Sequence, residues 1–237
     1  MKHLIKNIIA VLSAATLSLM VISCASKASD DYDYTYDYRE DGSEFINDVE
    51  PVSTENFLAN IDPVELEPLY FLHKSGKKVI PKEVKKAYLV PRTNAVELHL
   101  HDGVNNLIII WRKAERDKIL EACRTFLQQY DEKTIPHKKV NRKNAYFNSR
   151  CSLWYGVLTA SNGCEKNKYF MIPEFINKKP YLLIRFSPTQ TTTGENQYSP
   201  KVSLYMSPSQ IRDFLEVMDQ NNLEAQIKVN KKKAYTY

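Results

Sequence analysis

The stretch that decides the fold runs from Val96 to Tyr130 and reads VELHLHDGVNNLIIIWRKAERDKILEACRTFLQQY. Its first five residues alternate apolar and polar side chains, a period of two that predicts a strand with one buried face. An Asp-Gly turn at 102–103 follows, and the apolar run over 107–111 predicts a second, more fully buried strand. Beyond that run, apolar side chains recur at helical spacing and predict an amphipathic helix. These side chains are Ile119, Leu120, Cys123, Phe126, Leu127 and Tyr130.

The carboxy-terminal part of the chain repeats this order of strands followed by a helix. Its predicted strands cover 152–160, 168–175, 181–186 and 202–206, with a Ser-Asn-Gly turn at 161–163 between the first two. The sequence Ser-Pro-Ser-Gln then predicts the start of a helix, with Ser207 as N-cap, Pro208 in the first turn and Gln210 closing a capping box. The buried stripe of that helix comprises Ile211, Phe214, Leu215 and Met218.

Two segments that each follow a predicted helix match one another. Lys139–Tyr146 reads KVNRKNAY, and Lys228–Tyr235 reads KVNKKKAY. A fixed spacing between similar segments indicates an internal duplication. We therefore expect an α+β fold of two similar units, each made of antiparallel strands plus one helix, over residues 63–147 and 148–237.

Residues 1–23 divide as a secretory signal does. Lys2 and Lys6 give a positive start, and an almost unbroken apolar run extends from Ile8 to Ile22. That run is about 15 residues long, whereas a membrane-spanning helix needs roughly 20. The pattern favours a removable signal peptide over an anchor helix.

The apolar run ends in Val21-Ile22-Ser23-Cys24, which resembles the lipobox of bacterial lipoproteins. The resemblance implies that a diacylglycerol is attached to the sulfur of Cys24, that the chain is cut between Ser23 and Cys24, and that the new amino group is acylated, for example with palmitate. Each lipid CH₂ buried in a bilayer contributes about 0.8 kcal/mol, so two or three chains form a stable anchor. Ala25 after the cysteine favours the outer membrane or the cell surface.

Charge divides the chain into an acidic segment and a basic body. Residues 25–62 contain eleven acidic and two basic side chains, a net charge of −9, and the residues from Pro63 onward carry a net charge of +12. The dense like charge and the scarcity of aliphatic residues predict that 24–62 form a largely disordered tether. The alternative is a recognition segment that docks on the basic body through its tyrosines or directs export to the surface.

Glu97, His99 and His101 alternate along one predicted strand, so their side chains share a face. Two imidazoles on one face are able to bind a divalent metal. The same pattern also describes the solvated face of a strand, and the sequence supplies no third ligand. We therefore assign neither a metal site nor a catalytic site.

Three cysteines remain after Cys24. Cys123 lies on the apolar face of the predicted helix and is expected to be a small core residue. Cys151 and Cys164 flank one predicted hairpin, but the predicted turn places them out of register, which argues against a disulfide between them.

Two basic segments occur at the matching positions of the proposed duplication. If the two units are related by symmetry, these segments form one positive surface for an anionic glycan, lipid head groups or an acidic protein. The alternatives are charge that maintains solubility, or charge that neutralises the acidic tether. The residues are Lys138, Lys139, Arg142, Lys143, Lys231, Lys232 and Lys233.

These observations predict a lipid-anchored, non-enzymatic module for binding or envelope assembly, exported to the periplasm or the cell surface. No cofactor is indicated, and an exported protein is not expected to bind nucleic acid. The alternative function is an envelope hydrolase or a metal-dependent enzyme with a site around Glu97, His99 and His101.

Overall fold

The computed structural model describes residues 58, 61–84, 86–193 and 197–234, except for the side chains at 82, 83 and 231–234. The predicted signal peptide, the lipobox and nearly all of the acidic tether lie outside the described residues. Their assignment remains a prediction from the sequence.

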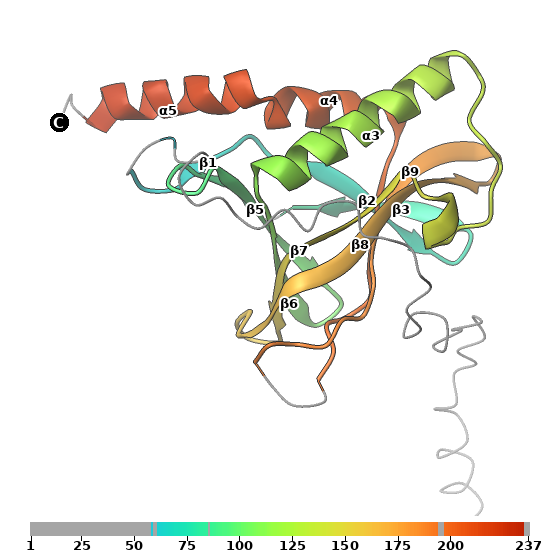
Figure 1. Ribbon diagram of the computed structural model, residues 1–237, viewed down its shortest axis with the longest axis horizontal. Helices are drawn as coiled ribbons and strands as arrows, with labels where there is room; N and C mark the ends of the chain where they lie inside the picture. The colour runs from blue at the N-terminus through green and yellow to red at the C-terminus, as the bar shows by residue number, and fades with distance from the viewer. Residues whose placement is uncertain (1–57, 59–60, 85, 194–196, 235–237) are drawn as a thin grey trace, which may run out of the picture. The chain divides into compact units, whose positions relative to one another are not determined.

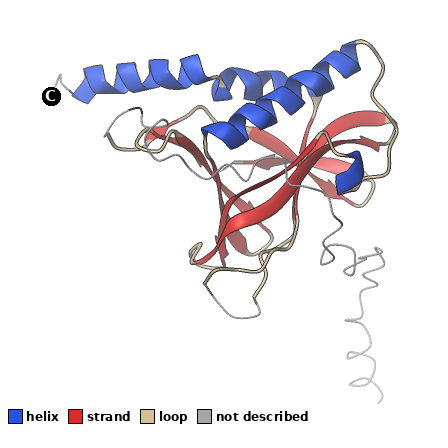
Figure 2. Ribbon diagram, viewed as in Figure 1, coloured by secondary structure: helices blue, strands red, loops and turns tan. Residues whose placement is uncertain are grey.

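The described residues form one antiparallel sheet of ten strands, in the order β1-β4-β5-β6-β7-β8-β9-β10-β2-β3 (Figure 1). The strands are β1 (Val64–Glu65), β2 (Tyr70–Ser75), β3 (Lys78–Glu83), β4 (Lys86–Val90), β5 (Ala95–Asp102), β6 (Asn105–Trp111), β7 (Phe147–Gly156), β8 (Asn162–Ile176), β9 (Lys179–Phe186) and β10 (Val202–Met206). The helices are α3 (Lys113–Asp131), α4 (Pro208–Met218) and α5 (Gln220–Ala234), with a short 3₁₀ turn, η1 (Arg142–Asn144). Figure 2 shows the three α-helices gathered on one side of the sheet.

The sheet curls strongly around the side chain of Phe214 on α4. The ring centroids of Trp111 on β6 and Phe71 on β2 each lie 6.1 Å from that of Phe214, so the two rings are within about 12 Å of each other. β6 and β2 are five places apart in the sheet. In a flat sheet with about 4.8 Å between neighbouring strands they would be about 24 Å apart. The sheet therefore forms a half-barrel whose concave face meets the helices.

The main core fills this concave face. It joins inward-facing side chains of the strands, such as Leu98, Ile109 and Ile184, to the buried stripes of the helices. Cys123 on α3 is fully buried in this core, which confirms its predicted place. A smaller apolar cluster around Phe170 and Leu183 lies apart from this core and packs against Val140 in the connection between α3 and β7.

A buried arginine ties the helices to the sheet. Arg116 on α3 donates hydrogen bonds to the backbone carbonyl of Asn94, to the Asn94 side-chain oxygen at 3.0 Å and to the Gln220 side-chain oxygen at 2.7 Å. Asn94 lies in the turn between β4 and β5, and Gln220 begins α5. Burial lowers the pKa of Arg116 to about 10, so the guanidinium is still charged at neutral pH. The contact joins three elements that are distant in sequence.

The predicted fold class of two similar α+β units is wrong. β6 pairs directly with β7, from Asn106 opposite Gly156 to Ile110 opposite Ser152, so one continuous sheet crosses the proposed boundary. The matched segments also fold differently. Residues 142–144 form η1 and β7 begins at Phe147, whereas Lys228–Ala234 belong to α5.

The different fates of the matched segments have a local cause. Asn141 accepts a hydrogen bond from the backbone N–H of Asn144 at 3.0 Å and so caps a single short turn. The second segment keeps asparagine at the matching position, Asn230, but has Lys233 in place of Asn144, and its three consecutive lysines favour helix and let α5 continue. A shared pattern of residues was therefore not evidence for a shared structure.

Several local predictions are confirmed. The strands around 96–100 and 107–111 pair as the hairpin β5–β6, and α3 follows them. Ser207 and Gln210 form the predicted capping box, with Pro208 at the helix start. The predicted turn at 161–163 is misplaced, because β7 ends at Gly156 and β8 already begins at Asn162.

We expect Phe214→Ala to lower the free energy of unfolding by about 3–5 kcal/mol, since removing the ring leaves a cavity between β2, β6 and α4. Urea unfolding followed by tryptophan fluorescence measures this loss. Leu215→Ala is the matched control, because Leu215 is on the same helix but only half-buried. Equal losses for the two variants would contradict a special role for Phe214.

Candidate functional site

Two hairpin tips meet at one end of the sheet. The β2–β3 turn consists of Gly76 and Lys77, and the β8–β9 turn consists of Asn177 and Lys178. The side-chain amide of Asn177 donates a hydrogen bond to the backbone carbonyl of Lys77 at 2.7 Å. This bond joins segments one hundred residues apart in the chain and holds the two turns together.

The geometry of both turns follows from their backbone angles. Gly76 has a φ of 58°, the position at which a two-residue hairpin loop of type II′ requires glycine. Asn177 and Lys178 have φ values of 50° and 64°, as a type I′ turn requires at both central positions. Asparagine tolerates this region, but lysine is disfavoured there because its Cβ approaches the following carbonyl oxygen.

The connection between α3 and β7 adds a third segment to this end. The ring of His137 stacks on that of Phe175, one residue before the end of β8, with centroids 3.7 Å apart. Val140 packs against the apolar cluster that contains Ile176. These contacts place the connection that carries Lys138 and Lys139 beside the β8–β9 hairpin. Figure 1 shows this connection running past that end of the sheet.

We call the lysines that these three segments bring together the basic end. All of them are exposed to solvent. Glu174 is 2.9 Å from Lys74, accepts a hydrogen bond from the hydroxyl of Tyr205 at 3.0 Å and lies 4.0 Å from Arg185. The carboxylate therefore neutralises part of the charge and anchors Lys74. The basic end comprises Lys74, Lys77, Lys78, Lys138, Lys139, Lys178 and Lys179.

The basic end is suited to a charged, extended ligand. Lysine presents a point charge on a flexible stem, and it does not impose the paired geometry of an arginine fork. Neighbouring cations on a protruding surface add to one local positive potential. Such a surface attracts repeated negative charges without fixing the shape of the molecule that carries them.

The two basic segments predicted from the sequence are not brought together. Lys138, Lys139 and Lys143 are exposed in the α3–β7 connection, whereas Arg142 is buried. The backbone carbonyl of Arg142 accepts a hydrogen bond from the Asn148 side chain at 3.2 Å. Lys231, Lys232 and Lys233 lie in the last turns of α5, at the far end of the structure from η1 (Figure 1).

Sequence reasoning missed five of the seven lysines of the basic end. Lys74, Lys77, Lys78, Lys178 and Lys179 were not among the predicted site residues. The signal available in the sequence was a pair of adjacent lysines at each of two short turns, Lys77-Lys78 and Lys178-Lys179. Nothing in the sequence indicates that these turns touch, because β2 reaches β9 through its pairing with β10.

The predicted histidine pair does not gather a metal site. Nε2 of His99 lies 3.3 Å from Oε2 of Glu97, and the ring of His99 packs edge-on against that of Tyr88. A hollow of about 180 Å³ opens beside His99 and His101, and Glu97 is not among its lining residues. The described part of the chain holds no group of three or more His, Cys, Asp or Glu side chains placed to bind a metal ion.

The cysteines offer no nucleophile. Cys123, Cys151 and Cys164 are all buried free thiols, so Cys151 and Cys164 form no disulfide. Burial raises the pKa of the Cys151 thiol well above its ordinary value, with a smaller contribution from Glu115. Since the thiolate is the reactive form, these cysteines are chemically inert at neutral pH.

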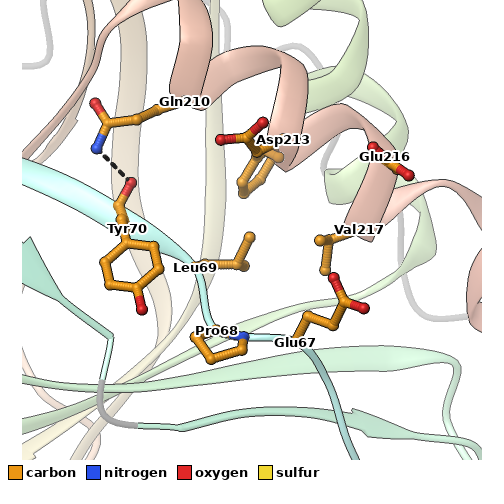
Figure 3. A pocket seen from close by; sticks show the side chains of 9 residues that line it. Glu67, Pro68, Leu69, Tyr70, Gln210, Asp213, Glu216 and Val217 are labelled. Atoms are coloured by element: carbon orange, nitrogen blue, oxygen red, sulfur yellow. Dashed lines mark hydrogen bonds between the residues drawn. The ribbon is translucent and has the colours of Figure 1, made fainter.

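A second hollow, of about 240 Å³, lies between the β1–β2 connection and α4 (Figure 3). The Gln210 side chain donates a hydrogen bond to the backbone carbonyl of Tyr70 at 2.8 Å and closes one side. Glu67, Asp213 and Glu216 line it, but Figure 3 shows their carboxylates spread around the hollow. This arrangement provides acidic charge without a converged site.

Comparison with known proteins gives a family but no activity. Residues 57–225 match the family model described as "Uncharacterised Treponema protein". An "Uncharacterized protein" of Treponema pallidum (strain Nichols) is 24% identical over 137 residues, which cover 57% of this chain and 48% of the relative. The match thus spans about half the length of that relative, and no solved structure matches. Within the described residues, no helix is both long and apolar enough to span a membrane.

We expect Lys178→Gly to raise the free energy of unfolding by about 0.5–1 kcal/mol, because relief of the left-handed backbone exceeds the entropy that glycine adds to the unfolded chain. The shift of the urea midpoint measures the gain. Lys179→Gly removes the same charge from a strand residue and is expected to destabilise the protein. A loss of stability in Lys178→Gly would show that the lysine itself supports the turn.

Proposed function

The chain belongs to the family described as "Uncharacterised Treponema protein", and we propose that it serves as an exported, lipid-anchored, non-enzymatic binding module. Its ligand in this proposal is an extended polyanion, such as an acidic glycan, held by the basic end. Cys24 carries the lipid, and residues 25–62 link the lipid to the folded part of the chain.

The observation that carries the proposal is the convergence of three lysine pairs from separate segments. Lys77 and Lys78, Lys138 and Lys139, and Lys178 and Lys179 reach one surface through the Asn177 hydrogen bond and the His137 stack. Like charges placed side by side repel one another. Their assembly costs free energy that an anionic ligand would recover.

The backbone of the β8–β9 turn supports the same proposal. Lys178 has a φ of 64°, where glycine would be accommodated without strain. Strained backbone conformations occur preferentially at functional sites, where a side chain is needed despite its cost. We infer that Lys178 is kept at this strained position because its positive charge is needed at the tip of the turn.

The acidic part of the same chain is a competing occupant. Residues 25–62 carry a net charge of −9 and are joined covalently to the folded part, so their effective concentration near the basic end is high. They would compete with an external polyanion at the same lysines. Conversion of Asp30, Asp31, Asp33 and Asp37 to asparagine would then tighten binding of an external polyanion.

We expect Cys24→Ser to abolish incorporation of labelled palmitate and to release the protein from the membrane fraction, since the sulfur that accepts the lipid is lost. Metabolic labelling and fractionation of the producing cells measure both effects. Cys164→Ser is the control, because it removes a buried thiol and should leave labelling intact. Continued labelling of Cys24→Ser would contradict the lipid anchor.

We expect replacement of Lys77, Lys178 and Lys179 by glutamine to weaken binding to dextran sulfate about ten-fold at low salt, given roughly 0.2–1 kcal/mol for each exposed ion pair. Titration calorimetry measures the affinity, with uncharged dextran as the ligand control. Binding by the unsubstituted protein should also fail near 1 M salt, where the screening length is only about 3 Å.

The matched control replaces Lys231, Lys232 and Lys233 by glutamine. It removes the same number of charges from the end of α5 and should leave the affinity nearly unchanged. Equal weakening in the two triple variants would mean that net charge alone drives binding. No weakening in the first variant would overturn the role of the basic end.

A further inference from the structure

Two other hairpin tips carry exposed aliphatic side chains. Val104 lies in the β5–β6 turn and is 73% exposed, and Val157 and Leu158 lie in the β7–β8 connection and are 63% and 91% exposed. The side-chain amide of Asn106, at the start of β6, donates hydrogen bonds to the carbonyl oxygens of Val157 at 2.7 Å and Leu158 at 3.2 Å. This contact fixes the two tips side by side. We call Val104, Val157 and Leu158 the aliphatic tip.

The aliphatic tip is held in a defined conformation. Gly156 allows the chain to fold back tightly, since a Cβ there would lie 2.0 Å from the carbonyl oxygen of Thr159. The backbone N–H of Ser161 donates to the same Thr159 oxygen at 2.9 Å. Apolar side chains fixed in an exposed position incur an unfavourable hydration free energy that contact with an apolar phase would remove.

The composition around the tip favours such a contact. Residues 103–106 and 156–162 contain no charged side chain. The carbonyl oxygens at the apex already have hydrogen-bond donors, so moving them out of bulk water costs less than moving free carbonyls. The nearest ionisable residues in the β5–β6 hairpin are His101 and Asp102, and Asp102 directly precedes the Gly103-Val104 turn.

We propose that the aliphatic tip enters the interfacial region of the lipid bilayer to which the protein is anchored. The inference rests on the lipid anchor of the proposed function, but not on polyanion binding. A bilayer is the favoured occupant because the side chains stand at convex turn apexes, which insert into a soft surface, and the hollow beside Leu158 is only about 180 Å³.

The length of the link makes this contact reachable. Leu58 is the first described residue, and the 33 residues 25–57 separate it from Cys24. At no more than about 3.6 Å per residue, they reach at most about 120 Å. Three aliphatic side chains alone give weak affinity for a bilayer. The anchor makes the second contact intramolecular, so weak affinity is sufficient.

The contact would also orient the protein. β8 begins at Asn162, next to the aliphatic tip, and ends at Ile176, next to the basic end. The two surfaces therefore lie at opposite ends of one 15-residue strand. With the aliphatic tip in the bilayer, the lysines of the basic end are directed away from the anchoring membrane and toward a soluble polyanion.

The test compares an environment-sensitive fluorophore at the two ends of β8. Leu158→Cys and Lys178→Cys are labelled in the lipidated full-length protein, which is then reconstituted into phosphatidylcholine vesicles. Cys123, Cys151 and Cys164 are buried, and Cys24 is occupied by lipid, so labelling is directed to the introduced thiol. Spin-labelled lipids in the vesicles report contact by quenching the fluorophore.

The label at position 158 should shift its emission to shorter wavelength and be quenched by the spin-labelled lipids, and high salt should leave both effects unchanged. The label at 178 should show neither. Val157→Asp in the 158-labelled protein should abolish the shift without changing palmitate incorporation. Identical spectra at the two positions would overturn the inference while leaving the anchor intact. A concentration-dependent shift at 158 without vesicles would show a second protein copy as the occupant instead.

Discussion

The contact of Phe214 with both Trp111 and Phe71 is the constraint on which the rest of the structure depends. It forces strands five places apart to approach one α-helix, and the sheet between them has to curl. β2 pairs with β10 near the far edge of this curled sheet, and the β2–β3 turn there reaches the β8–β9 turn. The convergence of lysines at the basic end thus depends on the same strand arrangement that packs Phe71 and Trp111 against Phe214.

The basic end also shows how backbone conformation and charge act together. A type I′ turn supplies the sharp reversal that sends β9 back along β8, and most sequences would place glycine at its second central residue. Here the residue is Lys178, and the neighbouring Asn177 uses its side chain to hold Lys77. One turn therefore carries strain, a charge and the hydrogen bond that joins the two hairpins. These three features would be lost separately by different substitutions, which makes their roles distinguishable.

Local features of the fold were predictable from the sequence, and the assembly was not. The alternation at 96–100 and the Ser207 capping box depend on neighbouring residues, so they appear in the sequence pattern. Strand order depends on which edges meet, and β2 pairs with β10 across more than one hundred residues. The predicted duplication was wrong because matching positions such as Asn144 and Lys233 have different helix propensities. Within the basic end, Lys138 and Lys139 could be assigned to a binding surface from the sequence. Their neighbours Lys77 and Lys178 could not, because only the long-range pairing of β2 with β10 brings the two turns together.

The two ends of β8 act through forces that respond differently to the surroundings. Attraction between lysines and a polyanion falls as salt is added, because mobile ions screen charges beyond about 8 Å at physiological ionic strength. Burial of Val157 and Leu158 depends on apolar area and is largely indifferent to moderate salt. Because β8 is paired on both sides within a sheet that has a packed core, the orientation of one of its ends determines that of the other. In the proposed arrangement, a domain held by its apolar tip would keep its charged end presented while ligands bind and leave, and the two contacts would need no direct coupling.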